Sequence, residues 1–348
     1  MLPFLEKAVD LSREYARYFA PYQHVADPLI DAAEKGMTTA SVRSLFSELR
    51  SKLIPIVCAI ADQPVPGDDC LRGSFSEPAQ LDFSLSLVKQ FGYDIDRGRL
   101  DKTHHPFCTK FSSGDVRITT RVEGTPLGTG TSAGVHESQA RLWENVIGRG
   151  RAFWEHFYPV LRNTFPDQFR QIGFETFYRA INKVQRSLIR TDADEVTYNL
   201  HIMMRFDLEL ELLEGHLRVT DLPEAWRARM QADLGVAPGD DRDGCLQDVH
   251  WYGGTVGGGF QSYTIGNILS AQFYDAAVKA HPGIPLEIPN GKFGTLHGWL
   301  REQLYQHGRK FQPGELVVRA AGGPMSTGPY LAYLRAKYGE LYRLDLAP

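Results

Sequence analysis

Side chains able to bind metal, transfer protons or hold carboxylates gather in five short clusters along the sequence. Histidine and glutamate bind zinc and act as general acids and bases, and arginine binds carboxylates through its planar fork. The clusters lie at 104–107 (HHPF), 115–119 (DVRIT), 136–141 (HESQAR), 189–201 (IRTDADEVTYNLH) and 244–251 (GCLQDVHW). Each cluster taken alone has an ordinary structural explanation, so their weight lies in their combination.

The first two clusters are weak signals by themselves. His104 and His105 are adjacent and cannot face one metal ion from a helix, where side chains of one face stand three or four residues apart. Alone they indicate a histidine pair in a loop. In the second cluster, alternation places Asp115, Arg117 and Thr119 on one face of a strand, which is typical of a solvated sheet face.

The third cluster invites comparison with HExxH, in which two histidines one helical turn apart bind zinc and the glutamate acts as general base. The comparison fails because position 140 is alanine. His136 and Glu137 alone do not make a zinc site. The spacing of Glu137 and Arg141 instead predicts an ordinary ion pair along a helix.

The fourth and fifth clusters combine charged residues with turn signals. Asp194 and Glu195 suit the first turn of a helix, where negative charge complements the helix dipole, and this leaves Arg190 and His201 unexplained. The fifth cluster runs into a glycine-rich loop at 253–259 that no Lys-Ser/Thr follows, so it is not a phosphate-binding loop. The glycines indicate backbone that passes close to a neighbouring group.

Most elements that must position these residues are predicted to be helices, because apolar residues recur at spacings of three and four. The N-terminal segment places one such set on a single helical face: Phe4, Ala8, Leu11, Tyr15 and Phe19. Further helices are predicted from about residue 41 to 60 with a kink or break at Pro55, from near 136 to 147, over 153–174 with interruptions at Pro159 and Pro166, and at 224–234. Residues 196–213 are ambiguous, and their 18-residue length favours a buried helix over a strand.

Strand signals are few. Residues 115–122 alternate well, and residues 216–220 provide a short second candidate strand. The sequence contains no internal repeat and no low-complexity tract. We therefore predict a mainly α fold, in which residues 1–348 form a single helical domain with a small antiparallel sheet.

Composition excludes several classes of protein. Hydrophobic residues make up 43% and charged residues 23%, which is ordinary globular usage. No apolar run approaches the roughly 18 residues of a membrane span, and the charged N-terminal pattern predicts no secretory signal. The four cysteines have no close-paired spacing, which favours a reduced, cytoplasmic setting over a disulfide framework. A net charge of −4 and a pI near 6.3 make nucleic acid an unexpected partner.

In order, the segments HPF, DVRIT, HES, IRTDAD and GCLQDVHW resemble the signature set of the Taq-type (thermostable) metallocarboxypeptidases. The surrounding stretches GTSAGVHESQARLWEN, DADEVTYNLHI and GGGFQSYTIGN also resemble that family, and the resemblance covers the chain from Leu2 onward. It implies a zinc-dependent, mostly helical, zincin-like body. It further implies a cytoplasmic, commonly homodimeric protein that releases C-terminal amino acids from peptides held in a deep groove.

The resemblance also implies roles for particular residues. Family members hold zinc with the two histidines of HExxH and a glutamate of the HES motif, so Glu137 would be the third metal ligand. His250 and Tyr263 resemble catalytic residues that donate hydrogen bonds to the developing oxyanion. Arg190 resembles a residue that meets the peptide backbone or terminal carboxylate, and the match adds three further substrate-binding residues: Arg117, Gln247 and Asp248.

The chain departs from the family pattern in two places. No HExxH is present: Arg121-Val122 runs straight into Glu123-Gly124-Thr125-Pro126, so the zinc helix is expected to be missing near 122–123. A further N-terminal helical region of the family, ahead of Leu2, is also expected to be missing. With Glu137 alone of three expected ligands, we expect the zinc site to be incomplete.

Two hypotheses follow for the function. The first is a metallocarboxypeptidase that recruits other ligands, Glu137 with His104, His105 or His136. The second, which we favour, is a non-catalytic relic that binds peptide C-termini or forms an oligomeric scaffold without cutting. Loss of a helix would expose apolar surface, so the second hypothesis predicts a homodimer or other self-association.

Overall fold

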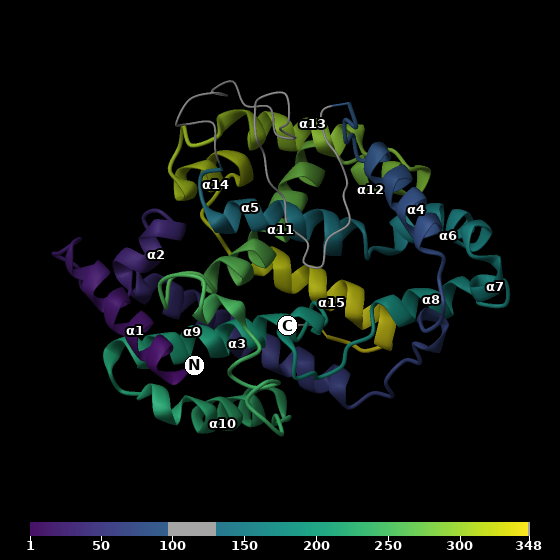
Figure 1. The fold of residues 1–348 in the computed structure, drawn as a ribbon. Helices are drawn as coiled ribbons and strands as arrows, with labels where there is room; N and C mark the ends of the chain where they lie inside the picture. Colours follow the sequence, from purple (N-terminus) through teal and green to yellow (C-terminus); the bar gives the residue numbers. More distant parts are fainter. Residues whose placement is uncertain (97–129, 347–348) are drawn as a thin grey trace.

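Helices form the regular structure of residues 1–96 and 130–346, the parts of the chain that the computed structural model describes (Figure 1). The α-helices are α1 (Leu2–Arg17), α2 (Asp27–Ala33), α3 (Thr39–Ala61), α4 (Glu77–Gln90), α5 (Ala133–Arg141), α6 (Arg151–Thr164), α7 (Pro166–Phe169), α8 (Phe174–Ile181), α9 (Tyr198–Glu214), α10 (Leu222–Leu234), α11 (Gln261–Ala280), α12 (Ile284–Glu287), α13 (Gly294–Gln303), α14 (Pro313–Ala321) and α15 (Gly328–Tyr342). A π-helical turn, Leu142–Ile147, continues α5.

The predicted antiparallel sheet is wrong, because the described ranges contain no strand. Residues 115–122 lie outside those ranges. Residues 216–220 form a turn that leads into a 3-10 helix, Val219–Asp221. Gly215 ends α9 with a φ of +81°, and the backbone N–H groups of His216 and Leu217 donate to the carbonyl of Glu211 at 3.0 and 3.1 Å. Since the end of the helix uses these donors, no extended pairing remains for them.

The first helix forms as predicted, but a different face of it is buried. α1 packs through Leu5, Val9, Ser12 and Ala16. Of the five side chains predicted to form the buried face, Ala8 packs partly against the core. The other four are exposed, with Phe4 at 76%: Phe4, Leu11, Tyr15 and Phe19, the last of which lies beyond the end of α1. Apolar residues occur on two adjacent sides of this helix, and periodicity alone does not say which side meets the core.

Other helices form where they were predicted, although α3 has no break at Pro55 and the interruption predicted at Pro159 is wrong, because α6 continues through that proline. α3 buries Val42, Leu49, Leu53, Ile56 and Ile60 and continues through Pro55 as one helix. α9 is the buried helix predicted for residues 196–213, and nearly all of its side chains are buried. α6 and α7 meet at the predicted interruption before Pro166, and α10 begins at Leu222 with proline in its first turn.

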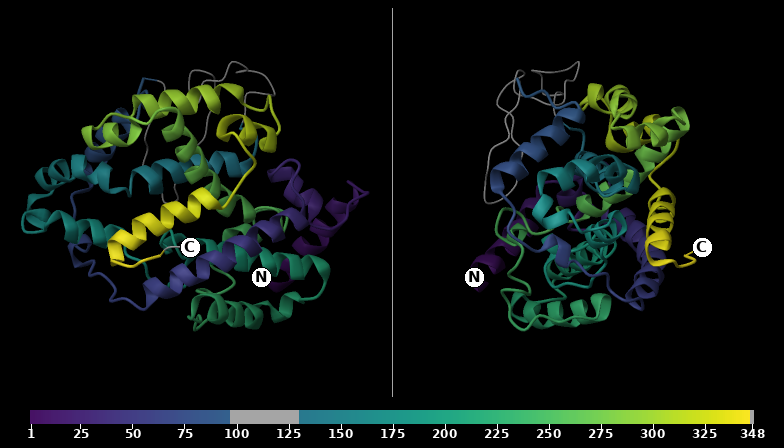
Figure 2. Two further views of the ribbon diagram at one scale, coloured as in Figure 1. Left: turned by 180° about the vertical axis from the view of Figure 1, so that it is seen from behind. Right: turned by 90° about the vertical axis from the view of Figure 1, so that its right-hand side faces the viewer.

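α11 lies at the centre of the fold and contacts α5, α9, α14 and α15 (Figure 1). One hydrophobic core surrounds α9 and includes side chains of α3, α10 and α15. A second core lies between α5, α6, α11 and α13. Ile268 of α11 belongs to the first core and Ile265 to the second. α3 and α15 run side by side along one flank in both views of Figure 2.

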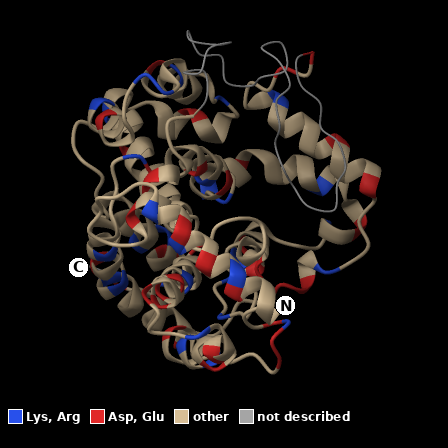
Figure 3. Cartoon of the chain, turned by 60° about the vertical axis from the view of Figure 1, so that its left-hand side comes forward, with Lys and Arg blue, Asp and Glu red and all other residues tan. Residues whose placement is uncertain are grey.

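No helix within the described ranges is both long and apolar enough to cross a membrane. Lysine and arginine are interspersed with aspartate and glutamate over the elements in Figure 3, with no extended region of one sign. This distribution agrees with the modest net charge of −4.

Candidate active site

Asp194 fixes the entrance to α9, on which much of the site is built. Its Oδ1 accepts hydrogen bonds from the N–H groups of Val196 and Thr197 at 2.9 and 3.0 Å. Its Oδ2 accepts a bond from the Thr197 hydroxyl at 2.7 Å. The prediction that Asp194 and Glu195 lie in the first turn of this helix is wrong, because α9 begins at Tyr198 and has no acidic residue in its first turn. Asp194 instead fixes the turn that leads into α9. Glu195 forms a buried ion pair with Lys337 of α15, at 2.9 Å between Oε1 and Nζ.

Arg190 lies just ahead of this entrance and is joined to Asp248 in the segment that precedes α11. Its Nε donates to Oδ2 of Asp248 at 2.6 Å, and its second terminal nitrogen donates to Oδ1 at 3.3 Å. The other terminal nitrogen donates to the hydroxyl of Tyr198 at 3.1 Å. Both charged side chains are buried. The structure thus brings together two residues that the sequence predicts to bind substrate, and joins them to each other.

Arg205 donates to the same carboxylate as Arg190. It is fully buried on α9, and its Nε donates to Oδ2 of Asp248 at 3.0 Å. Another nitrogen donates to Oε1 of Gln247 at 2.9 Å, and that oxygen also accepts the backbone N–H of Arg190 at 3.0 Å. The guanidinium carbon lies 4.6 Å from the ring centroid of Trp226. Gln247 and Asp248 are therefore fixed by Arg205 as well as by Arg190.

His250 and Tyr263 continue the arrangement toward the surface. Nδ1 of His250 lies 2.5 Å from Oδ1 of Asp248, and Nε2 lies 2.8 Å from the hydroxyl of Tyr263 on α11. Burial by itself raises the pKa of Asp248, but hydrogen bonds from His250 and Arg190 and the charges of Arg190 and Arg205 outweigh it. They hold the pKa of this carboxyl well below its usual range.

Tyr198 connects this group to the HES helix, α5. Its hydroxyl accepts a hydrogen bond from Arg141 at 3.2 Å, beside the bond from Arg190 at 3.1 Å. Arg141 in turn donates from Nε to Oε1 of Glu137 at 2.8 Å, which confirms the predicted ion pair along the helix. Two guanidinium groups therefore donate to one phenolic oxygen, and each also pairs with a carboxylate: Arg141 with Glu137, and Arg190 with Asp248.

The remaining residues of the five clusters lie elsewhere. Arg117, His104 and His105 lie outside the described ranges, and His136 is exposed on α5. His201 is completely buried on α9, and neither ring nitrogen has a hydrogen-bond partner within the described part of the chain. Burial, followed by the charge of Arg205, lowers its pKa to about 3, so the imidazole is neutral at ordinary pH.

The described residues do not fit the zinc ion that the family resemblance implies. Within residues 1–96 and 130–346, no group of three or more His, Cys, Asp or Glu side chains is placed to hold a metal ion. Glu137, the one expected ligand in these ranges, is engaged by Arg141. A zinc site needs three or four such ligands around one point. No chemical step at this site is therefore assigned to a metal ion.

Sequence reasoning missed Arg205 and gave Tyr198 no role, although these residues organise the site. One signal was available for Arg205: it is the single charged residue in the stretch Ile202–Phe206 of a helix expected to be buried. A buried arginine needs acceptors, so its position predicts an internal carboxylate or amide partner. Which acceptor it meets depends on how the segment before α11 folds back onto α9.

Three comparisons place the chain among known proteins. A model of the family described as carboxypeptidase Taq (M32) metallopeptidase matches residues 1–125 and 122–338. Thermostable carboxypeptidase 1 of Thermus thermophilus is 41% identical over 382 residues, with 98% of this chain and 74% of that protein covered. Carboxypeptidase 1 of Bacillus subtilis is 34% identical, with 98% of this chain and 74% of that protein covered.

A solved structure is similar over nearly the whole chain. The crystal structure of M32 carboxypeptidase from Deinococcus radiodurans R1 has a TM-score of 0.95 and 49% sequence identity, covering 99% of this chain and 75% of that chain. The two stretches matched by the family model overlap at residues 122–125. The alignment with the Thermus protein spans 382 positions, whereas this chain has 348 residues. The Thermus protein therefore contains residues within the aligned region that have no counterpart in this chain.

Proposed function

The chain belongs to the carboxypeptidase Taq (M32) metallopeptidase family, and on that premise we propose that it binds peptide C-termini and hydrolyses them slowly or not at all. The observation that carries the proposal is a contrast within one site. The polar groups around Asp248 form a continuous, satisfied network. The described carboxylates and imidazoles, by comparison, form no group suited to a metal ion.

Recognition of a terminal carboxylate would rely on arginine. A guanidinium has five N–H donors, and Arg190 directs three toward Asp248 and Tyr198. Arg141 donates to the same Tyr198 hydroxyl as Arg190. The remaining N–H donors of these two arginines are suited to charge-assisted hydrogen bonds with a peptide carboxylate. Gln247 and Asp248 would act indirectly, by fixing the orientation of Arg190. Arg117 is proposed as a further substrate contact from the family match alone.

The resting hydrogen bonds of His250 and Tyr263 favour binding over catalysis. The Asp248 carboxylate only accepts hydrogen bonds, so Nδ1 of His250 carries the proton between them. In the neutral imidazole, Nε2 then accepts from the Tyr263 hydroxyl, whose proton is directed into the protein. Tyr263 can donate to a substrate oxyanion only after leaving His250, or after His250 takes a second proton. Neither group is therefore preorganised for that role.

For the metal we propose zinc, held weakly. Zinc suits imidazole and carboxylate ligands, and in peptidases it polarises the carbonyl and supplies an activated water. Glu137 remains the proposed ligand in the described ranges. The alternative, an active peptidase with recruited histidines, requires His104, His105 or His136 to meet Glu137.

Binding and turnover can be measured separately. An N-acylated dipeptide with a free C-terminus should bind to the protein. Its C-terminal amide should bind at least tenfold more weakly, because the lost charge-assisted hydrogen bond contributes more than about 1.4 kcal/mol. Arg190→Ala should abolish this difference in affinity. Hydrolysis of the same dipeptide is measured with added zinc or cobalt, in the wild type and in the Glu137→Ala variant. Turnover that depends on Glu137 would overturn the proposal and support recruited ligands. Equal binding of acid and amide would contradict the recognition of C-termini.

We also propose that the chain self-associates as a homodimer through the outer face of α1. Phe4, Leu11 and Tyr15 are exposed on this helix and Phe19 is exposed just beyond its end, and exposed apolar groups of this kind are typical of interfaces. Light scattering should give a dimer, and Phe4→Ser with Leu11→Ser should give a monomer of unchanged helix content. A wild-type monomer at high concentration would contradict this.

A cytoplasmic location is proposed because the described cysteines, Cys58, Cys70 and Cys245, are free thiols.

A further inference from the structure

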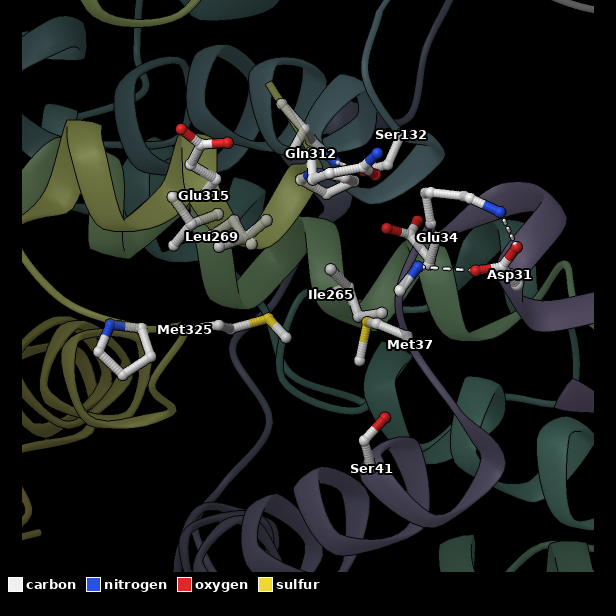
Figure 4. Close-up of a pocket in the computed structure, with 17 residues that line it drawn as sticks. Asp31, Glu34, Met37, Ser41, Ser132, Ile265, Leu269, Gln312, Glu315 and Met325 are labelled. Atoms are coloured by element: carbon white, nitrogen blue, oxygen red, sulfur yellow. Dashed lines mark hydrogen bonds and ion pairs between the residues drawn. The ribbon is translucent and has the colours of Figure 1, made fainter. Parts of the chain in front are cut away.

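A cavity of about 490 Å³ lies on the side of α5 and α11 that carries Val135, Ile265 and Leu269 (Figure 4). It is bounded by the end of α2, the first turn of α5, the middle of α11, the start of α14 and residues 324–325. Its volume lies within the range of roughly 300–1,000 Å³ typical of small-molecule sites. None of the residues of the candidate active site described above lines it.

The walls of the cavity are mostly apolar and partly adaptable. Ile265 and Leu269 lie along α11, and Met37 and Met325 line the cavity near them in Figure 4. Methionine side chains are unbranched and polarisable, so they adjust to apolar groups of different shapes. The cavity can therefore accommodate apolar ligand groups of different shapes.

The charged groups of the cavity are mainly acidic. Asp31, Glu34 and Glu315 line it, together with Lys35. Asp31 is paired with Lys35, and Glu315 accepts from Arg319 at 2.9 Å. An anionic ligand would meet like charge here, and the lysine that lines the cavity is already engaged.

Glu34 differs from the other two carboxylates. Its side chain is buried, at 2% exposure of the residue, and its Oε1 accepts the backbone N–H of Gly134 at the start of α5. Within the described part of the chain, no lysine, arginine or histidine forms an ion pair with it. Burial raises the pKa of Glu34 and outweighs the neutral groups that hydrogen-bond to it. A buried carboxyl of this kind gains most from a cation that arrives in the same low-dielectric space.

The backbone at Gly134 is shaped to keep this carboxyl in place. A Cβ on Gly134 would lie 2.8 Å from Oε1 of Glu34 and closer still to a methyl carbon of Ile265. Any other residue would push the carboxyl or the cavity wall away. The close approach of α5 to both groups therefore requires glycine at this position.

We propose that this cavity binds a small organic cation, with its apolar body against Ile265, Leu269 and Met325 and its ammonium group on Glu34. The apolar walls supply most of the contact area, and the buried carboxyl of Glu34 supplies the selectivity for positive charge. The site is separate from the proposed peptide-binding function and does not depend on it.

Three probes with a similar aromatic body test the charge selectivity: 2-phenylethylammonium, 2-phenylethanol and 3-phenylpropionate. Calorimetric titration of the full chain should give saturable binding of the ammonium at millimolar concentration or below. The alcohol should bind at least tenfold more weakly, about 1.4 kcal/mol, and the carboxylate should not bind. Equal affinity for the ammonium and the alcohol, or no saturable binding of the ammonium, would overturn the proposal.

Two variants locate the selectivity. In Glu34→Gln the amide oxygen can still accept the N–H of Gly134, so the fold should be kept while the preference for the ammonium over the alcohol disappears. Glu315→Gln, at the rim and already paired with Arg319, should retain the preference. A preference that survives Glu34→Gln, with unchanged helix content by circular dichroism, would show that the ammonium binds elsewhere and would refute the site.

Discussion

Arg190 and Arg205 donate to the same oxygen atom, Oδ2 of Asp248, at 2.6 and 3.0 Å. All three side chains are buried, and the carboxylate also meets His250 through its other oxygen. One negative charge thus lies between two guanidinium groups and an imidazole. Arg205 has no exposed surface, so its part in this arrangement is to position Asp248 and Gln247 and, through them, Arg190 and His250.

Asp248→Asn should destabilise the protein strongly. The variant leaves two buried arginines without their carboxylate, and breaking a buried ion pair by removing one partner costs about 3–5 kcal/mol. Urea denaturation measures the change. Asp275→Asn, which breaks only the exposed pair with Lys279 on α11, is the matched control and should leave the midpoint unchanged. Similar midpoints for both variants would show that the buried arginines find other acceptors.

Arg205→Lys separates positioning from simple packing. Lysine keeps the charge but cannot reach Asp248, Gln247 and the carbonyl of His201 together, as the guanidinium does at 2.9–3.0 Å. We expect discrimination between a peptide acid and its amide to fall several-fold, because Arg190 loses its fixed partner. Arg229→Lys, at a half-exposed pair with Glu211, should leave the discrimination unchanged. Unchanged discrimination in Arg205→Lys would assign this arginine to stability alone.

Glu209 makes stability depend on pH. Burial raises the pKa of its carboxyl to about 8, from an ordinary value of 4.5. The native state therefore keeps a proton that the unfolded chain releases, so this contribution favours folding below about pH 4.5 and is lost as pH rises toward 8. Glu209→Gln keeps the acceptor for the N–H of Gly257, and its free energy of unfolding should exceed that of the wild type increasingly between about pH 5 and 8. A constant difference across that range would contradict the raised pKa.

Helix positions were largely predictable from the sequence, but the faces and contacts were not. The spacing of Val42, Leu49 and Leu53 identifies α3 because one apolar face determines both the helix and its burial. In α1 the same rule selected Phe4 and Leu11, whereas Leu5 and Val9 meet the core. Periodicity describes a helix by itself, and the choice between two apolar sides depends on what packs against it.

The predicted strand at 216–220 failed for a related reason. A short alternating run pairs only if a second strand lies beside it, and the left-handed turn at Gly215 directs the chain back toward α10 instead. At the site, family resemblance selected Arg190, Asp248, His250 and Tyr263, which the structure brings together. It did not predict that Arg205 shares the carboxylate, because that contact joins segments far apart in the sequence.

Gly134→Ala and Gly298→Ala should change stability in opposite directions. A Cβ at position 134 would lie 2.8 Å from Oε1 of Glu34 and closer still to Ile265, so the neighbouring helices must shift, at a cost of about 1–3 kcal/mol. At Gly298, inside α13, no described heavy atom lies within 4 Å of the added carbon, and alanine should stabilise by about 0.5–1 kcal/mol. Thermal unfolding of both variants checks this. A neutral Gly134→Ala would mean that the contact between α5 and Glu34 is loose.

The metal content of the purified chain should be far below one zinc per molecule after dialysis. Glu137 is the single zinc ligand predicted within the described ranges, and its Oε1 accepts a hydrogen bond from Arg141. One carboxylate by itself does not hold zinc against water. Elemental analysis of the wild type and Glu137→Ala should therefore give equally low values. Zinc added at the concentration of the protein should not raise the melting temperature measurably, because a weakly bound ion stabilises the native state little while its free concentration is below its dissociation constant. One zinc per chain, removed by a chelator and lost in Glu137→Ala, would instead show that other histidines complete the site and would restore the hypothesis of an active peptidase.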